Sequence, residues 1–369
     1  MTQSSFIVLE NGQVFKGESF GADGETVGEI VFTTGMTGYL ETLTDPSYYG
    51  QIVVQTFPLI GNYGVIPDDF ESSSPKLKAY IVREWCQFPS NFRSRGGLDA
   101  FLKIHNIIGV CGIDTRELTK IIREFGVMNT KITATVDDID DIDDIDEILA
   151  EIKNYKITDA VQKVSTREIS VTKGAPGGYK VVLWDFGAKE NIRRELIRRG
   201  CEVVTVPAHI AAEKIVDLKP DGIMLSNGPG DPADNKEIIK ELANLTDSGI
   251  PIFGICLGHQ LLALAQGAKT AKLKYGHRGA NQPVKDLKTG RVYITSQNHG
   301  YAVVNDSLPA SASISFLNAN DGTCEGIEYQ NMPAFTIQFH PEASAGPLDT
   351  NYLFDRFIDL IREEGLKCR

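Results

Sequence analysis

The second half of the chain alternates short apolar runs with amphipathic segments. Strand patterns cover 179–184, 202–206, 222–225 and 251–255. Helical patterns cover 191–199, 211–219, 236–248 and 257–266. Strands that alternate with helices of this length predict βαβ units and a parallel sheet covered on both faces. From about residue 270 alternating strands predict an antiparallel extension, and 351–364 predicts a closing amphipathic helix.

The first half of the chain has a different pattern. Residues 6–65 are rich in β-branched and aromatic residues interrupted by glycines, which favours a β-rich domain. Asp114 and Glu117 form a D-x-x-E variant of the capping box, so a helix is expected to begin there. The acidic run 137–147 has isoleucines at helical spacing and lacks the glycine of a calcium loop. It therefore predicts a helix with a solvated acidic face.

Together these patterns predict two domains, as the length of 369 residues also favours. We expect an N-terminal β-rich α+β domain over 1–150 and a helix end with a linker over 151–178. An α/β domain with a mostly parallel sheet and an antiparallel extension is expected over 179–369. The turn-forming residues of 165–178 favour the linker.

Composition narrows the class of protein. Apolar residues make up 42% of the chain and charged residues 23%, which is ordinary globular usage. The net charge of −12, without any local Lys/Arg run, argues against nucleic-acid binding. Six cysteines without a C-x-x-C pair indicate a reduced, intracellular protein. No secretory signal is apparent at the N-terminus, and no apolar stretch reaches the ~18 residues of a membrane span. We therefore expect a cytoplasmic protein.

Cys256 is the first candidate for chemistry. Residues 254–258 read G-x-C-x-G at a strand-to-helix junction, which is the layout of a nucleophile elbow. Flanking glycines allow the sharp turn, and the thiol would stand at the carboxyl end of a parallel sheet, where such folds bind ligands. The N-terminus of the next helix, at Leu257, would favour the thiolate. The alternative is a buried structural cysteine.

His340 and Glu342 are the second candidate. In residues 334–342 apolar and polar positions alternate as in a strand. Pro341 is expected to end the strand at His340. Residues two apart in extended chain share a face, so His340 and Glu342 would project together as the base and the orienting carboxylate of nucleophilic catalysis. The alternative is a surface histidine at a strand end.

The turn Ser226–Pro232, SNGPGDP, follows the third strand of the second half. Its N–H groups, with that of Leu257, could form an oxyanion hole. The alternative is an ordinary βα turn. His259, in the helix after the elbow, is expected to pack rather than react. No H-E-x-x-H or paired Cys/His spacing is present, so no metal site is predicted.

Three segments together, 254–260 (GICLGHQ), 226–232 (SNGPGDP) and 339–342 (FHPE), closely resemble the class I glutamine amidotransferase family. The first half narrows the resemblance. Residues 34–53, 112–118 (GIDTREL) and 296–303 (SQNHGYAV) are similar to the small-subunit family of carbamoyl-phosphate synthases. The resemblance runs along essentially the whole chain, and it implies a flavodoxin-like fold for the second domain.

Carried over position by position, the resemblance implies Cys256 as nucleophile, His340 as acid–base and Glu342 as its partner. The implied glutamine-binding residues are Ser47, Gly228, Gly230, Leu257, Gln260, Asn298, Gly300 and Tyr301. Ser47 would be contributed by the first domain, which would otherwise serve for docking and for gating the glutaminase. Tyr301 stands where the family commonly has Phe, and Cys111 where it commonly has a small apolar residue.

The resemblance also implies a partner. Glutamine would be hydrolysed through a thioester, and the ammonia would pass to a large synthetase subunit that makes carbamoyl phosphate for arginine and pyrimidine biosynthesis. This chain has no G-x-x-x-x-G-K-[ST] loop, so ATP and Mg²⁺ are expected on that large subunit and no cofactor on this chain.

Two alternatives remain open from the residues. One is a glutaminase that serves another synthetase, or a free-standing γ-glutamyl hydrolase; residues 34–53 and 112–118 argue against both. The other is a flavodoxin-like binding module without catalysis, and the loop 185–191 fits a flavin phosphate poorly.

Overall fold

The computed structural model describes residues 4–133 and 145–367. The chain divides into two compact units, Met1–Thr158 and Asp159–Arg369, and each is described here by itself. The boundary lies inside the segment 151–178 that the sequence analysis assigned to a helix end and linker. Residues 137–144 of the predicted acidic helix lie outside the described residues, and helix α4 is described over Ile145–Asn154.

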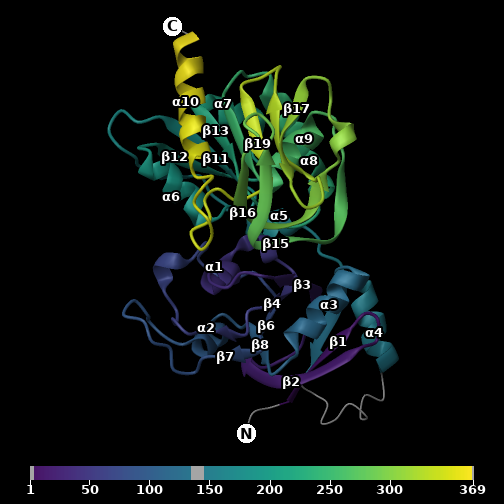
Figure 1. The fold of residues 1–369 in the computed structure, drawn as a ribbon. Coiled ribbons are helices and arrows are strands. Elements are labelled where there is room, and N and C mark those ends of the chain that lie inside the picture. Colours follow the sequence, from purple (N-terminus) through teal and green to yellow (C-terminus); the bar gives the residue numbers. More distant parts are fainter. Residues whose placement is uncertain (1–3, 134–144, 368–369) are drawn as a thin grey trace. The chain divides into compact units, whose positions relative to one another are not determined.

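The first unit is a closed barrel, which confirms the predicted β-rich domain (Figure 1). Its strands follow one another around the barrel in the order β1 (Ser4–Leu9), β2 (Val14–Gly21), β8 (Ile108–Cys111), β6 (Ala79–Ile81), β4 (Gln51–Gln55), β3 (Thr26–Thr33) and β9 (Met128–Thr133). The other elements are α1 (Tyr39–Thr44), the 3₁₀ turns Pro46–Tyr48 and Pro67–Asp69, the strand pair β5 (Leu59–Ile60) and β7 (Glu84–Trp85), α2 (Leu98–Ile104) and α3 (Thr115–Phe125).

Two helices of the first unit follow from local sequence. The Asp114 carboxylate accepts from Glu117 N–H at 2.9 Å, so the predicted cap begins α3. In α4 the isoleucine spacing turns Ile152, which is fully buried, toward the barrel. There Asn129 donates to Ile152 O at 3.0 Å, and Lys131 pairs with Glu151 at 2.8 Å. The described part of the acidic segment is therefore a helix with one packed face, as predicted.

The second unit is built on one ten-stranded sheet. Its order is β10 (Ser170–Thr172), β12 (Glu202–Pro207), β11 (Lys180–Asp185), β13 (Gly222–Leu225), β14 (Ile252–Ile255), β19 (Ala334–Ile337), β18 (Cys324–Tyr329), β17 (Ala312–Asn318), β15 (Thr270–Asp286) and β16 (Val292–Val303). The strands from β12 to β19 in this order pair in parallel. Those from β18 to β16 pair antiparallel, which confirms the predicted extension.

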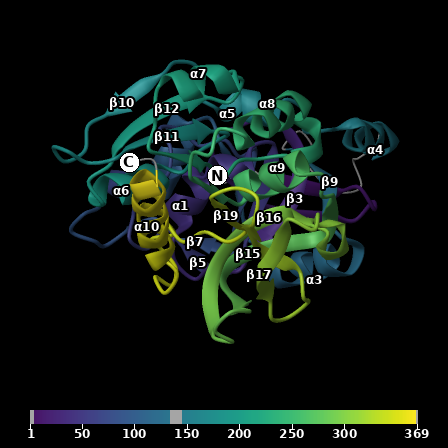
Figure 2. The same cartoon turned by 90° about the horizontal axis from the view of Figure 1, so that it is seen from above.

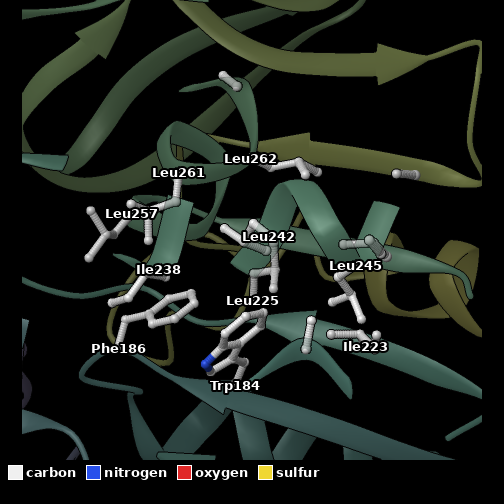
Figure 3. Packing of buried hydrophobic residues seen from close by; sticks show 14 of the residues in the cluster. Trp184, Phe186, Ile223, Leu225, Ile238, Leu242, Leu245, Leu257, Leu261 and Leu262 are labelled. Carbon is white, nitrogen blue, oxygen red and sulfur yellow. The ribbon is translucent and has the colours of Figure 1, made fainter. Parts of the chain in front are cut away.

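Helices cover both faces of this sheet (Figure 2). The helices α5 (Ala160–Val164), α7 (Ala212–Asp217), α8 (Lys236–Thr246) and α9 (Leu257–Ala265) contribute to one core. Those on the other face are α6 (Glu190–Arg198) and α10 (Tyr352–Lys367). Figure 3 shows Trp184 and Leu225 of the sheet in one cluster with Leu242 of α8 and Leu261 of α9. Central strands buried on both faces explain the continuous apolar runs in the sequence.

Two sequence expectations need correction. Part of the predicted linker is strand β10, in which Val171 pairs with Val204 at the edge of the sheet. The strand expected to end at His340 ends instead at Ile337. Beyond it the chain stays bonded to β18, where Gln338 N–H donates to Glu325 O, and then bonds to β16, where His340 N–H donates to Ser296 O. Among the described residues, no helix is apolar over a length that would cross a membrane.

Candidate active site

Cys256 occupies the sharp turn between β14 and α9. Its backbone has φ 53° and ψ −103°, a conformation that a residue with a Cβ rarely adopts. The two flanking glycines are sterically required. A Cβ on Gly254 would lie 2.8 Å from Thr336 Cγ2, and one on Gly258 would lie 2.6 Å from Leu225 O. This is the strained, glycine-flanked elbow that presents a nucleophile at the end of a strand.

The Cys256 side chain is 2% exposed, and its Sγ lies 3.7 Å from Asn298 O. Its N–H donates to Ile337 O at 2.9 Å, and its carbonyl accepts from Gln260 N–H at 3.1 Å. The thiol is thus held between β19, α9 and β16. Leu257, the first residue of α9, stands directly after it.

His340 and Glu342 form a buried pair. His340 Nδ1 lies 2.6 Å from Glu342 Oε1, and the two residues are 1% and 2% exposed. Because a carboxylate only accepts, Nδ1 carries the proton of this hydrogen bond. Among the described residues, the buried Nε2 of His340 has no hydrogen-bond partner. Nε2 is therefore the nitrogen that remains for proton transfer.

The fold brings Cys256 and His340 to the same edge of β16. Cys256 Sγ lies against Asn298 O, and His340 N–H donates to Ser296 O at 2.9 Å. Ser296 and Asn298 lie two residues apart in β16, so their carbonyl groups point to the same side of the strand. Two residues from distant parts of the chain are thus each bonded to carbonyls of β16 that lie two residues apart.

Lys189 is a charged neighbour that the sequence analysis missed. It precedes α6, in the loop after β11, and is 8% exposed. Its Nζ lies 3.5 Å from Glu342 Oε1, the same oxygen that His340 contacts. Its N–H donates to Asn227 Oδ1 at 2.9 Å, which fixes the loop. A lysine just beyond the carboxyl end of the first parallel strand was the available signal, since ligand sites of such sheets gather at that edge.

These neighbours control the charge of Glu342. Complete burial would raise the pKa of this carboxyl, but the charges of His340 and Lys189 and its hydrogen bonds outweigh burial and lower its pKa to about 2. Glu342 is therefore ionised at neutral pH. A buried carboxylate beside Nδ1 orients the imidazole and stabilises its protonated form.

The turn Ser226–Pro232 lies against the elbow. Gly258 N–H donates to Ser226 O at 2.9 Å, and a Cβ on Gly228 would lie 2.7 Å from the side chain of Leu257. Gly230 has φ +88°, which glycine adopts without strain. The structure therefore brings Gly228 and Leu257 together. The N–H of Gly258 holds the turn in place and is not a spare donor.

Residues of β16 and α9 also lie near Cys256. Gln260 Nε2 donates to Tyr301 O at 2.7 Å and to Gln338 Oε1 at 2.8 Å. Asn298 lies against the Cys256 thiol, and Gly300 lies next to Tyr301 in β16. These predicted glutamine-binding residues thus share one region with Cys256. Their binding role stays a prediction.

Ser47 belongs to the first unit. It lies in the 3₁₀ turn Pro46–Tyr48, where its N–H donates to Asp45 Oδ1 at 2.9 Å, and it is 8% exposed. Its predicted contribution to the glutamine site stays a prediction. His259 packs as expected: it is fully buried, its Nδ1 lies 2.8 Å from Thr336 Oγ1, and burial lowers its pKa to about 3.

Comparison with known families matches both units. Residues 182–360 match the model described as glutamine amidotransferase class-I. Residues 7–132 match the carbamoyl-phosphate synthase small chain, CPSase domain. A carbamoyl phosphate synthase small chain from Oceanobacillus iheyensis is 52% identical over 98% of this chain and 97% of its own length.

The chain belongs to the carbamoyl phosphate synthase small-chain family. A relative of the same description from Fusobacterium nucleatum is 53% identical over 95% of this chain and 96% of its own. One from Bacillus cereus is 52% identical over 97% of each. The family expected from the motifs is thereby confirmed, as is the amidotransferase fold of the second unit.

Proposed function

We propose that this chain is the glutamine-hydrolysing subunit of a carbamoyl-phosphate synthase. The observation that carries the proposal is the state of the buried His340. Its Nδ1 is hydrogen-bonded to Glu342, and its Nε2 has no hydrogen-bond partner among the described residues. His340 and Cys256 both contact β16. A strained cysteine, a histidine and an ionised carboxylate in this relation suit acyl transfer. Membership of the family supplies the substrate.

The chemistry proceeds in two steps. The Cys256 thiolate attacks the side-chain amide carbon of glutamine, forming a C–S bond. His340 gives a proton to the departing nitrogen, so ammonia leaves and a γ-glutamyl thioester remains. His340 then takes a proton from water, which attacks the thioester and releases glutamate and the thiol. Glu342 holds the imidazole through both steps, and Lys189 holds Glu342.

The oxyanion of each tetrahedral intermediate needs donors that are already in place. The N–H groups of Leu257, at the start of α9, and of Gly228, in the adjoining turn, suit this role. Loss of one such donor typically costs roughly 100- to 1000-fold in rate. Gln260, Asn298, Gly300, Tyr301, Gly230 and Ser47 are the residues that we propose for glutamine binding.

The ammonia must be used elsewhere. In water at neutral pH it becomes mostly ammonium and loses its nucleophilicity, so a shielded transfer is required. The sequence has no P-loop motif to hold ATP. We therefore assign the ATP, Mg²⁺ and bicarbonate chemistry to a large synthetase subunit, with this chain as its glutaminase. The first unit would serve for docking to it.

The other enzyme candidates are less well supported. A glutaminase of another synthetase, or a free γ-glutamyl hydrolase, would not require residues 7–132 to match the small-chain domain. A non-catalytic binding module would not require a strained cysteine beside a buried His–Glu pair.

The test is co-expression with a carbamoyl-phosphate synthase large subunit, followed by carbamoyl phosphate assays with glutamine and with ammonia. Cys256→Ser is expected to abolish synthesis from glutamine and to leave synthesis from ammonia. Cys111→Ser is the matched control, because that thiol is half-buried in the barrel, 3.5 Å from Glu18 O. If Cys256→Ser lost both activities or kept both, the proposed division of labour between this chain and the large subunit would be contradicted.

A further inference from the structure

His277, His299 and Glu325 form a buried cluster outside the catalytic pair. They lie on β15, β16 and β18, and they are 8%, 5% and 0% exposed. His277 and His299 are direct cross-strand partners. One ligand atom from each of the three lies within 4.8 Å of the other two. Two imidazoles and one carboxylate are a donor set typical of divalent transition metals.

The outer nitrogen of His277 is fixed by a carboxylate. Its Nε2 lies 2.9 Å from Asp321 Oδ2, so Nε2–H donates outward. Its Nδ1 is buried, has no hydrogen-bond partner among the described residues, and lies 3.6 Å from Glu325 Oε1. A carboxylate that holds the far nitrogen of an inward-facing imidazole is the usual outer support of a metal-binding histidine.

His299 presents a second lone pair. Its Nδ1 lies 2.7 Å from Tyr301 O, and because a carbonyl oxygen only accepts, Nδ1 carries the hydrogen and Nε2 holds the lone pair of the neutral imidazole. That Nε2 lies 3.1 Å from Gln297 Oε1, while the amide nitrogen of Gln297 donates to Glu325 Oε2 at 3.0 Å. In this arrangement two lone pairs face each other, and a cation between them would remove the conflict.

We propose that His277 Nδ1, His299 Nε2 and the Glu325 carboxylate form a Zn²⁺ site in the second unit. Zn²⁺ bonds of about 2.0–2.2 Å in a tetrahedron place ligand atoms roughly 3.3–3.6 Å apart, so atoms that now lie up to 4.8 Å apart need to approach by at most about 1.5 Å. Sequence spacing gave no sign of this site, because its ligands come from three strands. The proposal does not rest on the function proposed above.

The metal would stiffen the strand that supports the active site. His299 lies between Asn298, whose carbonyl contacts the Cys256 thiol, and Gly300 in β16. Tyr301 O accepts hydrogen bonds from both His299 Nδ1–H and Gln260 Nε2. Zn²⁺ would therefore join β15 and β18 to the strand that carries these groups.

A proton is the competing occupant. Burial lowers the pKa of His277, but Glu325 and Asp321 raise it more, so the ordinary alternative is an imidazolium between two carboxylates. The experiment uses the full chain carrying Cys256→Ser, which removes the catalytic thiol as a metal ligand. The protein is stripped with a chelator and titrated with Co²⁺, then with Zn²⁺.

We expect visible Co²⁺ absorption bands that Zn²⁺ displaces with one equivalent, and a higher Tm with Zn²⁺. His277→Ala and Glu325→Gln should lose both signals. Asp321→Asn, at a side chain that is 46% exposed, should keep the fold and weaken Zn²⁺ binding roughly 10- to 100-fold. His209→Ala is the matched control, since that imidazole is also 46% exposed and paired with a carboxylate, Glu237.

Two results would overturn the proposal. The first is a parent protein with neither Co²⁺ bands nor a Zn²⁺-dependent Tm, which would leave the proton as occupant. The second is an unchanged Zn²⁺ affinity in Asp321→Asn together with unchanged bands in Glu325→Gln, which would place the metal elsewhere.

Discussion

Glu342 Oε1 accepts from His340 Nδ1 at 2.6 Å in a region that water does not reach, since the two residues are 2% and 1% exposed. The same oxygen lies 3.5 Å from Lys189 Nζ. One carboxylate oxygen therefore fixes the imidazole ring and is itself held by a cation. The geometry orients His340 before any substrate binds, and it makes the charge of Glu342 the quantity to test.

Glu342→Gln should lower kcat for glutamine hydrolysis by up to roughly 10⁴-fold, the effect of the equivalent change in a serine protease triad. The amide is nearly isosteric but does not stabilise a protonated imidazole. Steady-state glutaminase kinetics check this, with Glu328→Gln as control because that carboxylate is partly exposed and pairs with Arg356 at 2.9 Å. Equal rates for the two variants would remove Glu342 from the mechanism.

The pH dependence of stability should report the same carboxylate. The pKa of Glu342 is lowered from 4.5 to about 2, so its contribution to stability is present above about pH 4.5 and is lost as the pH falls toward about 2. The shift corresponds to about 3 kcal/mol at neutral pH. We expect the Tm difference between the parent and Glu342→Gln to shrink over this range in calorimetry. A difference independent of pH would show that the ionised form is not favoured by folding.

Lys189→Met should raise the pKa of Glu342, because the charge of Lys189 is one of the causes that lower it. We expect a loss of up to about 3 kcal/mol in stability, the low end for breaking a buried ion pair. The acidic limb of the pH profile of kcat/KM should move to higher pH, and Lys189→Arg should restore it. Lys214→Met, at an exposed position of α7, is the control. An unmoved acidic limb in Lys189→Met would contradict the coupling.

Gly258→Ala should disturb the elbow, because the added Cβ would lie 2.6 Å from Leu225 O. Overpacking of this kind costs roughly 1–3 kcal/mol, and the displaced helix start should also lower glutaminase activity. Gly365→Ala in α10 is the matched helical control: nothing lies within 4 Å of its added Cβ, and stability should rise by roughly 0.5–1 kcal/mol. Urea unfolding of both variants makes the comparison. The steric argument fails if the two changes have the same sign.

Local pattern was sufficient for much of the fold. Apolar runs and amphipathic segments placed β13, α8 and α9 within two residues of their ends, because each burial pattern is set by neighbours along the chain. Edge strand β10 was missed because three exposed or half-buried residues carry no periodic signal. The end of β19 was misplaced because the chain past Ile337 still bonds to its neighbour β18 through Gln338 and then bonds to β16 through His340.

The candidate active site, too, could be predicted only in part. The G-x-C-x-G elbow and the H-x-E pair could be found because their geometry depends on residues adjacent in sequence. Lys189 could not be found in this way, because it acts through its contact with Glu342, a residue distant in sequence. The His277 cluster depends on three strands and has no local spacing at all.

Sequence by itself determined the backbone conformations that chemistry requires here: glycines where a Cβ has no room, and a proline after the base. Tertiary structure alone decided which distant groups share a dry environment, and hence their charges. The reason is that side-chain hydrogen bonds and desolvation act over a few ångströms in space, whatever the separation along the chain.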